Sequence, residues 1–382
     1  MSDKSPLAGI KVLELARILA GPWCGQTLAD LGADVIKVES PEGDDTRKWG
    51  PPYIEKDGER SAAYFHAANR GKRSVIADFT KEEGRALVLA LAAQSDVLIE
   101  NFKLGGLKKY GLDYESLKAV NPRLIYCSIT GFGQDGPYAP RAGYDFMIQG
   151  MGGIMDLTGE PDREPQKIGV AFADIFTGLY SVIAIQSALI AREKTGLGQQ
   201  IDMALFDCMT GVLANQAMNF LASGKVPKRL GNAHPNIAPY QTFPVADGHL
   251  IVACGNDAQF SRLVAILGLP ELADDPRFKT NATRVENRVA LTATMEAKTR
   301  AWMRDDLLAA LEKDGVPAGP INSVGDVFAD PQFLFREMQI APEGVAGVRT
   351  PIRFSDSELE LTKGAPVLGA HSAEIIAELG KN

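Results

Sequence analysis

The sequence predicts an α/β protein with two domains: a large one built on a Rossmann-like parallel β-sheet, and a smaller α+β one. Short strands alternate with helices through the first half of the chain, and those strands are apolar on both faces, which is typical of a parallel sheet covered on both sides. After residue 224 the pattern changes to a hairpin followed by helices. We therefore predict a large domain over 1–224, a small domain over 225–320 and a C-terminal segment over 321–382.

The chain opens with a compact βαβ unit. Residues 9–15 and 35–39 are β-type runs, and residues 23–31 between them form a helix with Pro22 at or near its first position. A crossover of this kind implies parallel strands. We expect further strands at 96–101, 124–129 and 200–206, and further helices at 81–95, 114–120, 174–192 and 207–222. Ligands bind off the carboxyl ends of such strands, here near 15–21, 39–49, 101–102 and 130–144.

The second half of the chain predicts the α+β domain. Strands at 242–245 and 249–254 flank Asp247-Gly248, a good hairpin turn. Helices are expected at 258–267, 284–303 and 304–313. The C-terminal segment should add strands at 350–354 and 358–361 and a helix at 373–379.

Bulk properties exclude several classes of protein. The net charge of -8 argues against a nucleic-acid binder, because phosphate neutralisation requires a basic face. The four cysteines form no CxxC pair and the four histidines form no metal pair, so we expect reduced thiols and no metal. The N-terminus lacks a signal sequence, and the apolar run 175–190 is interrupted by polar residues. We expect a cytoplasmic protein with no membrane segment.

Asp174 is the most informative single residue. It is the only charged residue between Lys167 and Arg192, at the entrance to a long apolar helix. One interpretation is a helix N-cap, whose carboxylate accepts hydrogen bonds from the open N–H groups of the first turn. The other is a carboxylate nucleophile beside a buried cavity. The local sequence leaves both open.

Three other features suggest ligand contacts. Arg47 and Trp49 lie in a turn-rich loop after the second strand, and the 70–73 stretch is basic enough to meet an anion. His234, in a loop rich in Gly and Pro, is the histidine best suited to line a pocket. Dinucleotide binding is disfavoured, because the first βα turn has no GxGxxG and carries a bulky Pro-Trp pair.

Six stretches together resemble the class III CoA-transferase family: 15–22 (LARILAGP), 31–39 (LGADVIKVE), 69–74 (NRGKRS), 97–102 (VLIENF), 173–174 (AD) and 194–199 (KTGLGQ). The resemblance runs from about 7 to 380. It implies a large domain made of both chain ends, a small domain in the middle and an interlocked homodimer. It also implies that Asp174 is the nucleophile, carrying an aspartyl anhydride and then an aspartyl-CoA thioester. Backbone N–H groups near the start of its helix could stabilise the oxyanions.

The resemblance assigns further site residues by position. Expected CoA contacts are Ala20, Arg73, Asn101, Phe102, Lys109 and Tyr144. Trp49 matches an aromatic residue that covers the acyl group in the formyl-CoA transferase branch, although other residues of that branch are replaced here. Coenzyme A enters as a thioester substrate, and no tightly bound cofactor is implied.

The substrates are suggested by finer motifs. Stretches 44–52, 141–145 and 231–241 resemble the branch that includes succinyl-CoA:glutarate CoA-transferase. That implies transfer from a donor such as succinyl-CoA to a dicarboxylic or related acid, with Arg47 or Arg141 holding the second carboxylate and His234 nearby. The alternative is a 2-methylacyl-CoA racemase. The racemase is disfavoured because Tyr144 stands where that branch has a histidine. A tyrosine, whose ordinary pKa is about 10, exchanges protons poorly at neutral pH.

Overall fold

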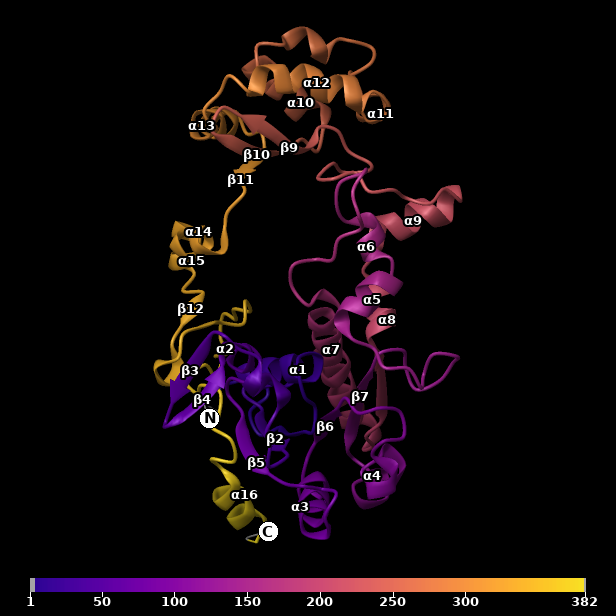
Figure 1. Cartoon of the computed structure of the whole chain (residues 1–382), viewed down its shortest axis with the longest axis vertical. Helices are drawn as coiled ribbons and strands as arrows, with labels where there is room; N and C mark the ends of the chain where they lie inside the picture. The colour runs from indigo at the N-terminus through magenta and orange to yellow at the C-terminus, as the bar shows by residue number, and fades with distance from the viewer. Residues whose placement is uncertain (1–3, 381–382) are drawn as a thin grey trace. The chain divides into compact units, whose positions relative to one another are not determined.

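The computed structural model describes residues 4–380, which form two compact units (Figure 1). The first unit contains residues 4–154, 167–218 and 331–380, so both chain ends belong to it. The second contains 155–166 and 219–330. These boundaries differ from the predicted ones at 224 and 320, and no feature of the sequence indicates that 155–166 joins the smaller unit.

The first unit is built on a six-stranded sheet with the order β5-β2-β1-β6-β7-β8. The strands are β1 (Lys11–Glu14), β2 (Asp34–Glu39), β5 (Arg73–Ile76), β6 (Val97–Glu100), β7 (Ile125–Thr130) and β8 (Gln200–Ala204). All neighbouring pairs are parallel, which confirms the predicted sheet. The chain moves outward from β1 in both directions, so the loop after β1 lies at the switch point where such sheets bind ligands.

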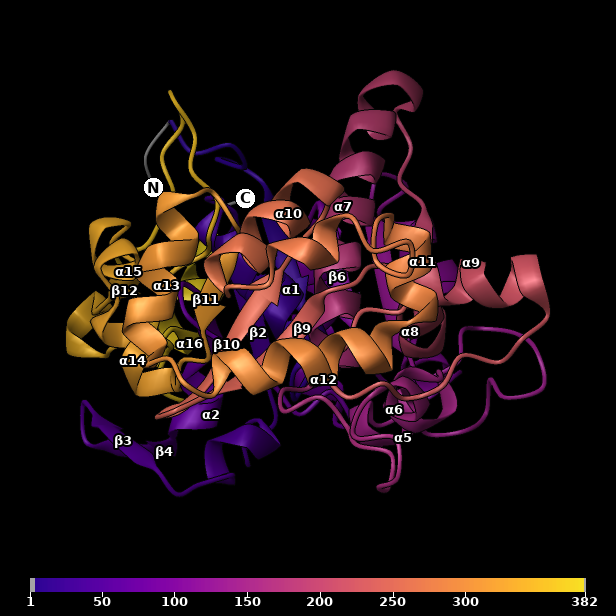
Figure 2. The same ribbon diagram turned by 90° about the horizontal axis from the view of Figure 1, so that it is seen from above.

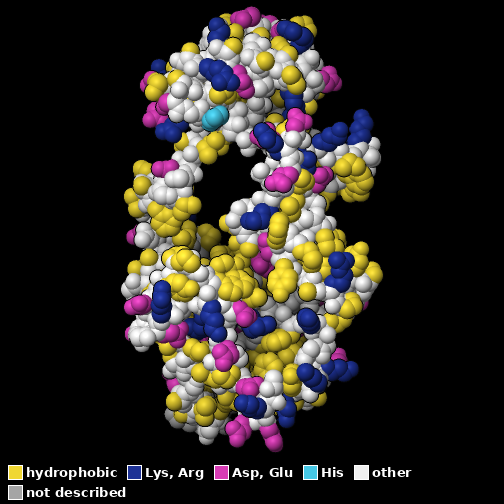
Figure 3. All heavy atoms as spheres, viewed as in Figure 1, with side chains coloured by type: hydrophobic (Ala, Val, Ile, Leu, Met, Phe, Trp, Pro, Cys, Tyr) yellow, Lys and Arg dark blue, Asp and Glu magenta, His cyan; other side chains and the backbone are white. Residues whose placement is uncertain are grey.

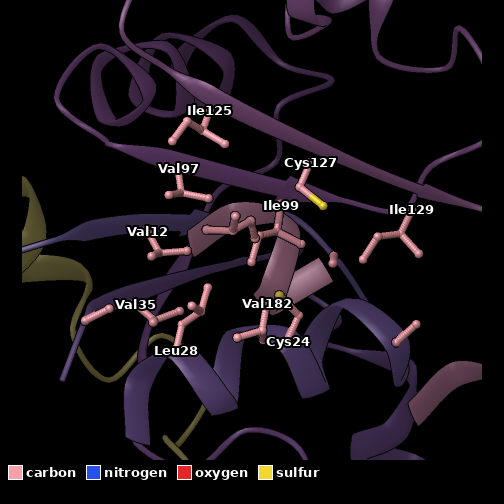
Figure 4. Close-up of a cluster of buried hydrophobic side chains, with 14 of the residues drawn as sticks. Val12, Cys24, Leu28, Val35, Val97, Ile99, Ile125, Cys127, Ile129 and Val182 are labelled. Atoms are coloured by element: carbon pink, nitrogen blue, oxygen red, sulfur yellow. The ribbon is translucent and has the colours of Figure 1, made fainter. Parts of the chain in front are cut away.

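Helices cover both faces of this sheet. On one face, α1 (Ala20–Asp30) and α7 (Phe172–Thr195) enclose alternate strand residues such as Val12, Ile99 and Cys127 (Figure 4). On the other face, α3 (Glu82–Ala93), α4 (Tyr114–Val120) and α16 (Ser372–Leu379) cover Leu13 and Leu98. Successive strand residues thus enter opposite cores, as the two-sided apolar pattern predicts.

The contact between α1 and α7 is unusually close at Gly178. A Cβ atom on this glycine would lie 2.8 Å from the Ala20 carbonyl oxygen and 3.2 Å from the Trp23 side chain. Any larger residue would push the two helix starts apart. Among residues 4–380, α7 alone is long and apolar enough to cross a membrane by length and composition, but its Val182 and Ile185 pack into the sheet core.

Smaller elements complete the first unit. They are η1 (Asp45–Lys48), the hairpin β3 (Tyr53–Lys56) and β4 (Glu59–Ala62), α2 (Ala63–His66), η2 (Lys108–Tyr110), α5 (Asp145–Met151), α8 (Leu205–Gly211), α15 (Pro331–Phe335), β12 (Gln339–Ile340), η4 (Pro342–Gly344) and β13 (Gly347–Val348). Helices α6 (Ile154–Leu157) and α9 (Ala214–Ser223) cross the unit boundaries. The C-terminal segment returns to the hairpin, where Glu59 accepts the Leu368 N–H at 2.8 Å.

The second unit is a three-stranded antiparallel sheet covered by helices (Figure 2). The strands, in the order β11-β10-β9, are β9 (Tyr240–Val245), β10 (Gly248–Ala253) and β11 (Ala318–Pro320). The helices are α10 (Asp257–Ile266), η3 (Pro270–Ala273), α11 (Asn281–Glu286), α12 (Arg288–Thr299), α13 (Arg304–Lys313) and α14 (Val324–Ala329). Phe243, Leu250 and Phe260 lie in a core separate from the large sheet.

Several predicted elements are wrong in detail. The strands expected at 350–354 and 358–361 do not form, because Pro351 lacks an N–H and no neighbouring strand pairs with this segment among the described residues. The helix expected over 207–222 breaks into α8 and α9, where Ala214 adopts a positive φ of 46°. The helix expected over 284–303 breaks at Asn287, whose side chain donates to the Thr283 carbonyl at 2.9 Å.

Candidate active site

A pocket opens at the carboxyl edge of the large sheet, where the sequence predicts ligand binding. Its volume is about 230 Å³, and its lining includes Arg17, Glu39, Phe79, Thr80 and Phe102. The Phe79 ring meets Phe102 edge-on at 5.6 Å, and Arg17 lies 5.8 Å from the Phe102 ring centroid. Aromatic faces beside a guanidinium suit a flat, electron-rich ring such as a purine.

Several predicted CoA contacts lie around this pocket. Phe102 lines it directly. Lys109 belongs to the same aromatic cluster, with its Nζ 4.7 Å from the Tyr110 ring, which in turn contacts Phe79 at 5.3 Å. The Asn101 side chain instead holds the loop after β1. It accepts the Arg17 N–H at 2.9 Å and donates to the Arg17 carbonyl at 2.7 Å. Ala20 is buried at the start of α1, against α7.

Asp174 lies in the first turn of α7 as its third residue and is half-buried. The N-cap is Ala171, and no side chain of the cap residue bonds to the helix. The prediction that Asp174 caps this helix is therefore wrong. The carboxylate of Asp145 takes that role, because its Oδ1 accepts the N–H groups of Ala173 at 2.8 Å and Asp174 at 3.3 Å.

Because of this capping, the backbone N–H groups in the first turn of α7 are not open to stabilise an oxyanion. The Phe172 N–H donates to the Val170 carbonyl at 2.8 Å, and the next two N–H groups donate to Asp145. The start of α7 therefore has no open N–H group in its first three positions. At the start of α1, by contrast, the N–H groups of Leu19, Ala20 and Gly21 have no acceptor among residues 4–380.

The environment of Asp174 changes its acidity. Burial, reinforced by the nearby negative charge of Asp145, raises the pKa of Asp174 to about 7. A carboxylate with this pKa is more basic and more nucleophilic than an ordinary one, yet is substantially ionised near neutral pH. With its capping role removed, the nucleophile interpretation is the one that the geometry favours.

An aromatic pair, Tyr64 and Trp49, lies in a region where the charge of Asp174 is felt. Burial raises the pKa of Tyr64, and the charges of Asp174 and Asp145 raise it further, so the phenol lies within electrostatic range of both. Trp49 packs edge-on against Tyr64 with 5.4 Å between ring centroids and is 47% exposed. The predicted role of Trp49 as a cover for the acyl group stays a prediction. Sequence reasoning missed Tyr64 because it lies in an Ala-rich stretch without a motif.

The structure contradicts the substrate role predicted for Arg47. Its side chain is buried, and four of its five N–H groups already donate: two to Glu39 at 2.8 Å, one to Glu59 at 2.7 Å and one to the Pro366 carbonyl at 3.0 Å. The guanidinium also stacks on the Phe65 ring at 3.7 Å. Arg47 is a bridge between the sheet, the hairpin and the C-terminal segment.

The Arg73 side chain is also already paired with protein carboxylates. Its guanidinium pairs with Asp34, Glu374 and Glu378. It begins β5, at the amino edge of the sheet and opposite the pocket edge. The structure therefore contradicts its predicted contact with CoA phosphates: the residue binds the C-terminal helix to the sheet.

Arg141 remains available. It lies in the 131–143 loop, whose neck is closed by direct contact of Gly131 and Gly143: a Cβ atom on Gly131 would lie 2.5 Å from the Gly143 Cα. Arg141 is exposed, rests on the Tyr138 ring at 4.6 Å and has no carboxylate partner among residues 4–380. The loop leads directly into Tyr144, which is 67% exposed, and Asp145. The predicted CoA contact of Tyr144 stays a prediction.

His234 belongs to the second unit. Its Nδ1 accepts the Asn236 N–H at 3.1 Å, and its ring lies 5.2 Å from that of Tyr240. Burial lowers the pKa of His234, and the charge of Arg288 lowers it further. The imidazole is therefore neutral near pH 7. Its predicted place near the acyl group stays a prediction.

The ionisation of Asp174 should depend on its pairing with Asp145. We expect kcat/KM for any reaction in which this carboxylate attacks to rise with pH through about 7, because the carboxylate of the free protein must be ionised. In Asp145→Asn the amide oxygen can still accept the helix N–H groups, but the repulsion is lost, so the midpoint should move to lower pH. A pH–rate profile tests this, with Asp207→Asn, at the third position of α8, as the control. An unshifted midpoint would exclude Asp174 as the titrating group.

The site combines a pocket suited to a nucleotide, at the carboxyl edge of the large sheet, with a carboxylate of raised pKa, Asp174, in the first turn of α7, and this combination fits a group-transfer enzyme. A family model described as CoA-transferase family III matches residues 7–372. The chain belongs to this family and is a CoA-transferase.

Named relatives and solved structures agree with this assignment. A succinate–glutarate CoA-transferase from Agrobacterium fabrum is 59% identical, covering 98% of this chain and 96% of its own. A succinyl-CoA:glutarate CoA-transferase from Mus musculus is 42% identical, covering 98% and 86%. A crystal structure of a CaiB/BaiF family protein from Brucella suis is 75% identical with a TM-score of 0.91, covering 99% and 100%. These comparisons give no support to the racemase alternative.

Proposed function

We propose that this CoA-transferase moves CoA from succinyl-CoA to glutarate or a dicarboxylate of similar length, with Asp174 as the covalent attachment point. The observation that carries the proposal is the half-buried Asp174 carboxylate, freed from capping by Asp145 and raised in pKa to about 7. The names of the Agrobacterium and mouse relatives support the choice of substrates.

The proposed chemistry needs no net proton or electron. The Asp174 carboxylate attacks the donor thioester carbonyl, the C–S bond breaks, and CoA leaves as a thiolate. The thiolate attacks the aspartyl carbonyl of the resulting anhydride, which releases succinate and leaves an aspartyl-CoA thioester. The acceptor carboxylate then displaces CoA from Asp174, and the thiolate attacks the acceptor carbonyl of the new anhydride. That last step frees the product thioester and restores the carboxylate.

The pocket at the sheet edge suits the adenosine part of CoA. The Phe102 ring offers a stacking surface. Lys109 lies nearby, and the exposed Arg17, which pairs with Asp45 at 2.8 Å, lies beside the ring. From this pocket the switch-point loop leads to the start of α1, where Gly178 contacts Ala20 one turn beyond Asp174. The pantetheine arm would follow this path to the nucleophile.

Arg141 is the cation that we assign to the second carboxylate of the acceptor. Of the two candidates from the sequence, Arg47 has four of its five N–H groups bound by protein oxygens. Among residues 4–380, the Arg141 guanidinium contacts aromatic rings and no carboxylate. Its loop continues into Asp145, whose side chain contacts the N–H of Asp174. A bound dicarboxylate would thus have one end at the nucleophile and the other near this loop.

A panel of acids tests the substrates. The protein is incubated with succinyl-CoA and glutarate, butyrate or acetate, and new CoA esters are followed by mass spectrometry. Glutaryl-CoA should form, and Arg141→Gln should raise the KM for glutarate about 10- to 100-fold, since a charge-assisted hydrogen bond contributes about 1.5–3 kcal/mol. The KM for butyrate should change little. Arg60→Gln is the matched control, because Arg60 also stacks on a tyrosine, at 4.2 Å. Equal effects on both acids would contradict the assignment.

A second copy of the chain belongs to this proposal. In one copy, α7 exposes Leu179, Ile183 and Ile190 along one side, and hydrophobic side chains also gather over α5 and α8 (Figure 3). Contiguous apolar surface of this kind marks an interaction site. An interlocked homodimer, which the family resemblance implies, would cover it. Sedimentation velocity checks this, and a lone 41.0 kDa species at micromolar concentration would contradict it.

A further inference from the structure

A buried cluster of charges lies beneath the switch-point loop 16–22. Glu14 ends β1, Lys37 lies in β2, Asp44 precedes η1 and Lys72 precedes β5. All four side chains have no exposure to solvent. Glu14 joins the two lysines, with its oxygens 3.0 Å from the Lys37 Nζ and 2.8 Å from the Lys72 Nζ.

Each ammonium donates its third hydrogen bond to the loop itself. Lys37 binds Glu14, Asp44 at 2.9 Å and the Ala16 carbonyl at 2.9 Å. Lys72 binds Glu14, the Asn69 side chain at 2.9 Å and the Pro22 carbonyl at 2.9 Å. An ammonium has three N–H bonds, so both groups are saturated. The two carbonyls that they hold are the first and last of the loop.

The loop between these carbonyls is strained. Ile18 has a φ of 72°, a left-handed conformation that is costly for a β-branched residue, about 1–3 kcal/mol. Such a conformation persists only when its surroundings fix it. Here the Ile18 N–H faces both Asp44 carboxylate oxygens at 3.3 Å, and Asn101 binds the neighbouring Arg17 backbone on both sides.

Stability alone does not account for this cluster. Removing charged groups from water costs several kcal/mol per ion, and well-packed apolar residues are often as stable as a buried ion pair. What the two lysine ammonium groups provide is a directional hydrogen bond to each of two loop carbonyls, those of Ala16 and Pro22. The loop so fixed begins α1, leaves the N–H groups of Leu19, Ala20 and Gly21 open, and packs its Ala20 carbonyl against Gly178 beside the nucleophile's turn.

We propose that Glu14, Lys37 and Lys72 form a charged clamp that positions the 16–22 loop against the helix carrying Asp174. They are positioning residues of the transfer reaction: their side chains have no exposure to solvent, and they act through the loop that they hold. This proposal rests on the proposed function, because it takes Asp174 as the reacting group. A loop displaced by about 1 Å at a reacting centre can cost about 100-fold in rate.

The test compares two buried-cation variants, Lys72→Met and Arg192→Met. Arg192 lies in the last turn of α7, is 4% exposed and pairs with Asp96 at 2.8 Å, so its loss also breaks a buried ion pair, at the far end of the same helix. Both variants should lose thermal stability. We expect only Lys72→Met to lower kcat, by about 100-fold, with the KM for either substrate changed less than about threefold.

Two further results keep the outcome clear. A kcat for Lys72→Met within about threefold of Arg192→Met would overturn the clamp. If Lys72→Met does not fold, the near-isosteric Glu14→Gln decides by the same criterion. Failure of the proposed function would appear differently, as full transfer by Asp174→Asn. If wild-type protein prefers another acid, the comparison is made with that acid and judges the clamp alone.

Discussion

Asp174→Asn is expected to abolish CoA transfer, lowering kcat by a factor of at least about 10⁴, because an amide cannot form the anhydride on which every later step depends. Binding of CoA thioesters should survive, since the pocket that we assign to the adenosine is lined by other residues. In wild-type protein, hydroxylamine added during turnover with succinyl-CoA should convert Asp174 to a hydroxamate that peptide mass spectrometry locates. The variant should show no such adduct.

The control for this variant is Asp207→Asn. Asp207 is the third residue of α8, as Asp174 is of α7, so both substitutions remove a negative charge that favours the helix N-terminus by about 0.3–1 kcal/mol. Only the loss of Asp174 should affect turnover. Retained transfer in Asp174→Asn would refute the covalent mechanism outright.

Arg47→Met is expected to lower the free energy of unfolding by about 3–5 kcal/mol, because it leaves the buried carboxylate of Glu39 without its cation. The Pro366 carbonyl and Glu59 lose a donor as well, so the hairpin and the C-terminal segment should loosen together. Thermal denaturation of the first unit should shift by on the order of 10 °C. The ratio of the KM values for glutarate and butyrate should not change.

The neighbouring Lys48→Met is the control for Arg47. Its side chain is 66% exposed and lies 3.7 Å from Glu42, so its loss should cost less than about 1 kcal/mol. If Arg47→Met were as stable as Lys48→Met yet bound glutarate poorly, Arg47 would be a substrate ligand after all. The Arg47 N–H groups would then contact the substrate in place of Glu39, Glu59 and Pro366.

The sheet could be predicted because its signals are local. Each strand is a short apolar run ended by a turn, and alternation with helices fixes parallel order. The cap of α7 could not be predicted, because the carboxylate that accepts the Ala173 N–H belongs to Asp145 in another helix. Likewise, nothing near Arg47 in the sequence shows that Pro366 lies against it.

Site residues could be predicted where a sequence motif marks them. They could not be predicted where tertiary packing alone brings them to the site. Asp174 stood out because it is isolated in an apolar helix. Tyr64 did not, because it belongs to the short helix α2 and no motif around it marks a role. The choice between Arg47 and Arg141 depended on whether nearby carboxylates had already neutralised each guanidinium, and only the fold decides that.

The contact between Gly131 and Gly143 has a consequence for changing what the enzyme accepts. Because the two backbones touch, the loop that carries Arg141 is anchored at its base and bears its own small stack of Phe132, Tyr138 and Arg141. The Gln134 N–H also donates to Asp202 at 2.9 Å, so the part of the loop open to exchange is the tip beyond Gln134. Acceptor selectivity should be open to redesign by grafting tips of other lengths, provided both glycines are kept, while the reacting centre stays untouched.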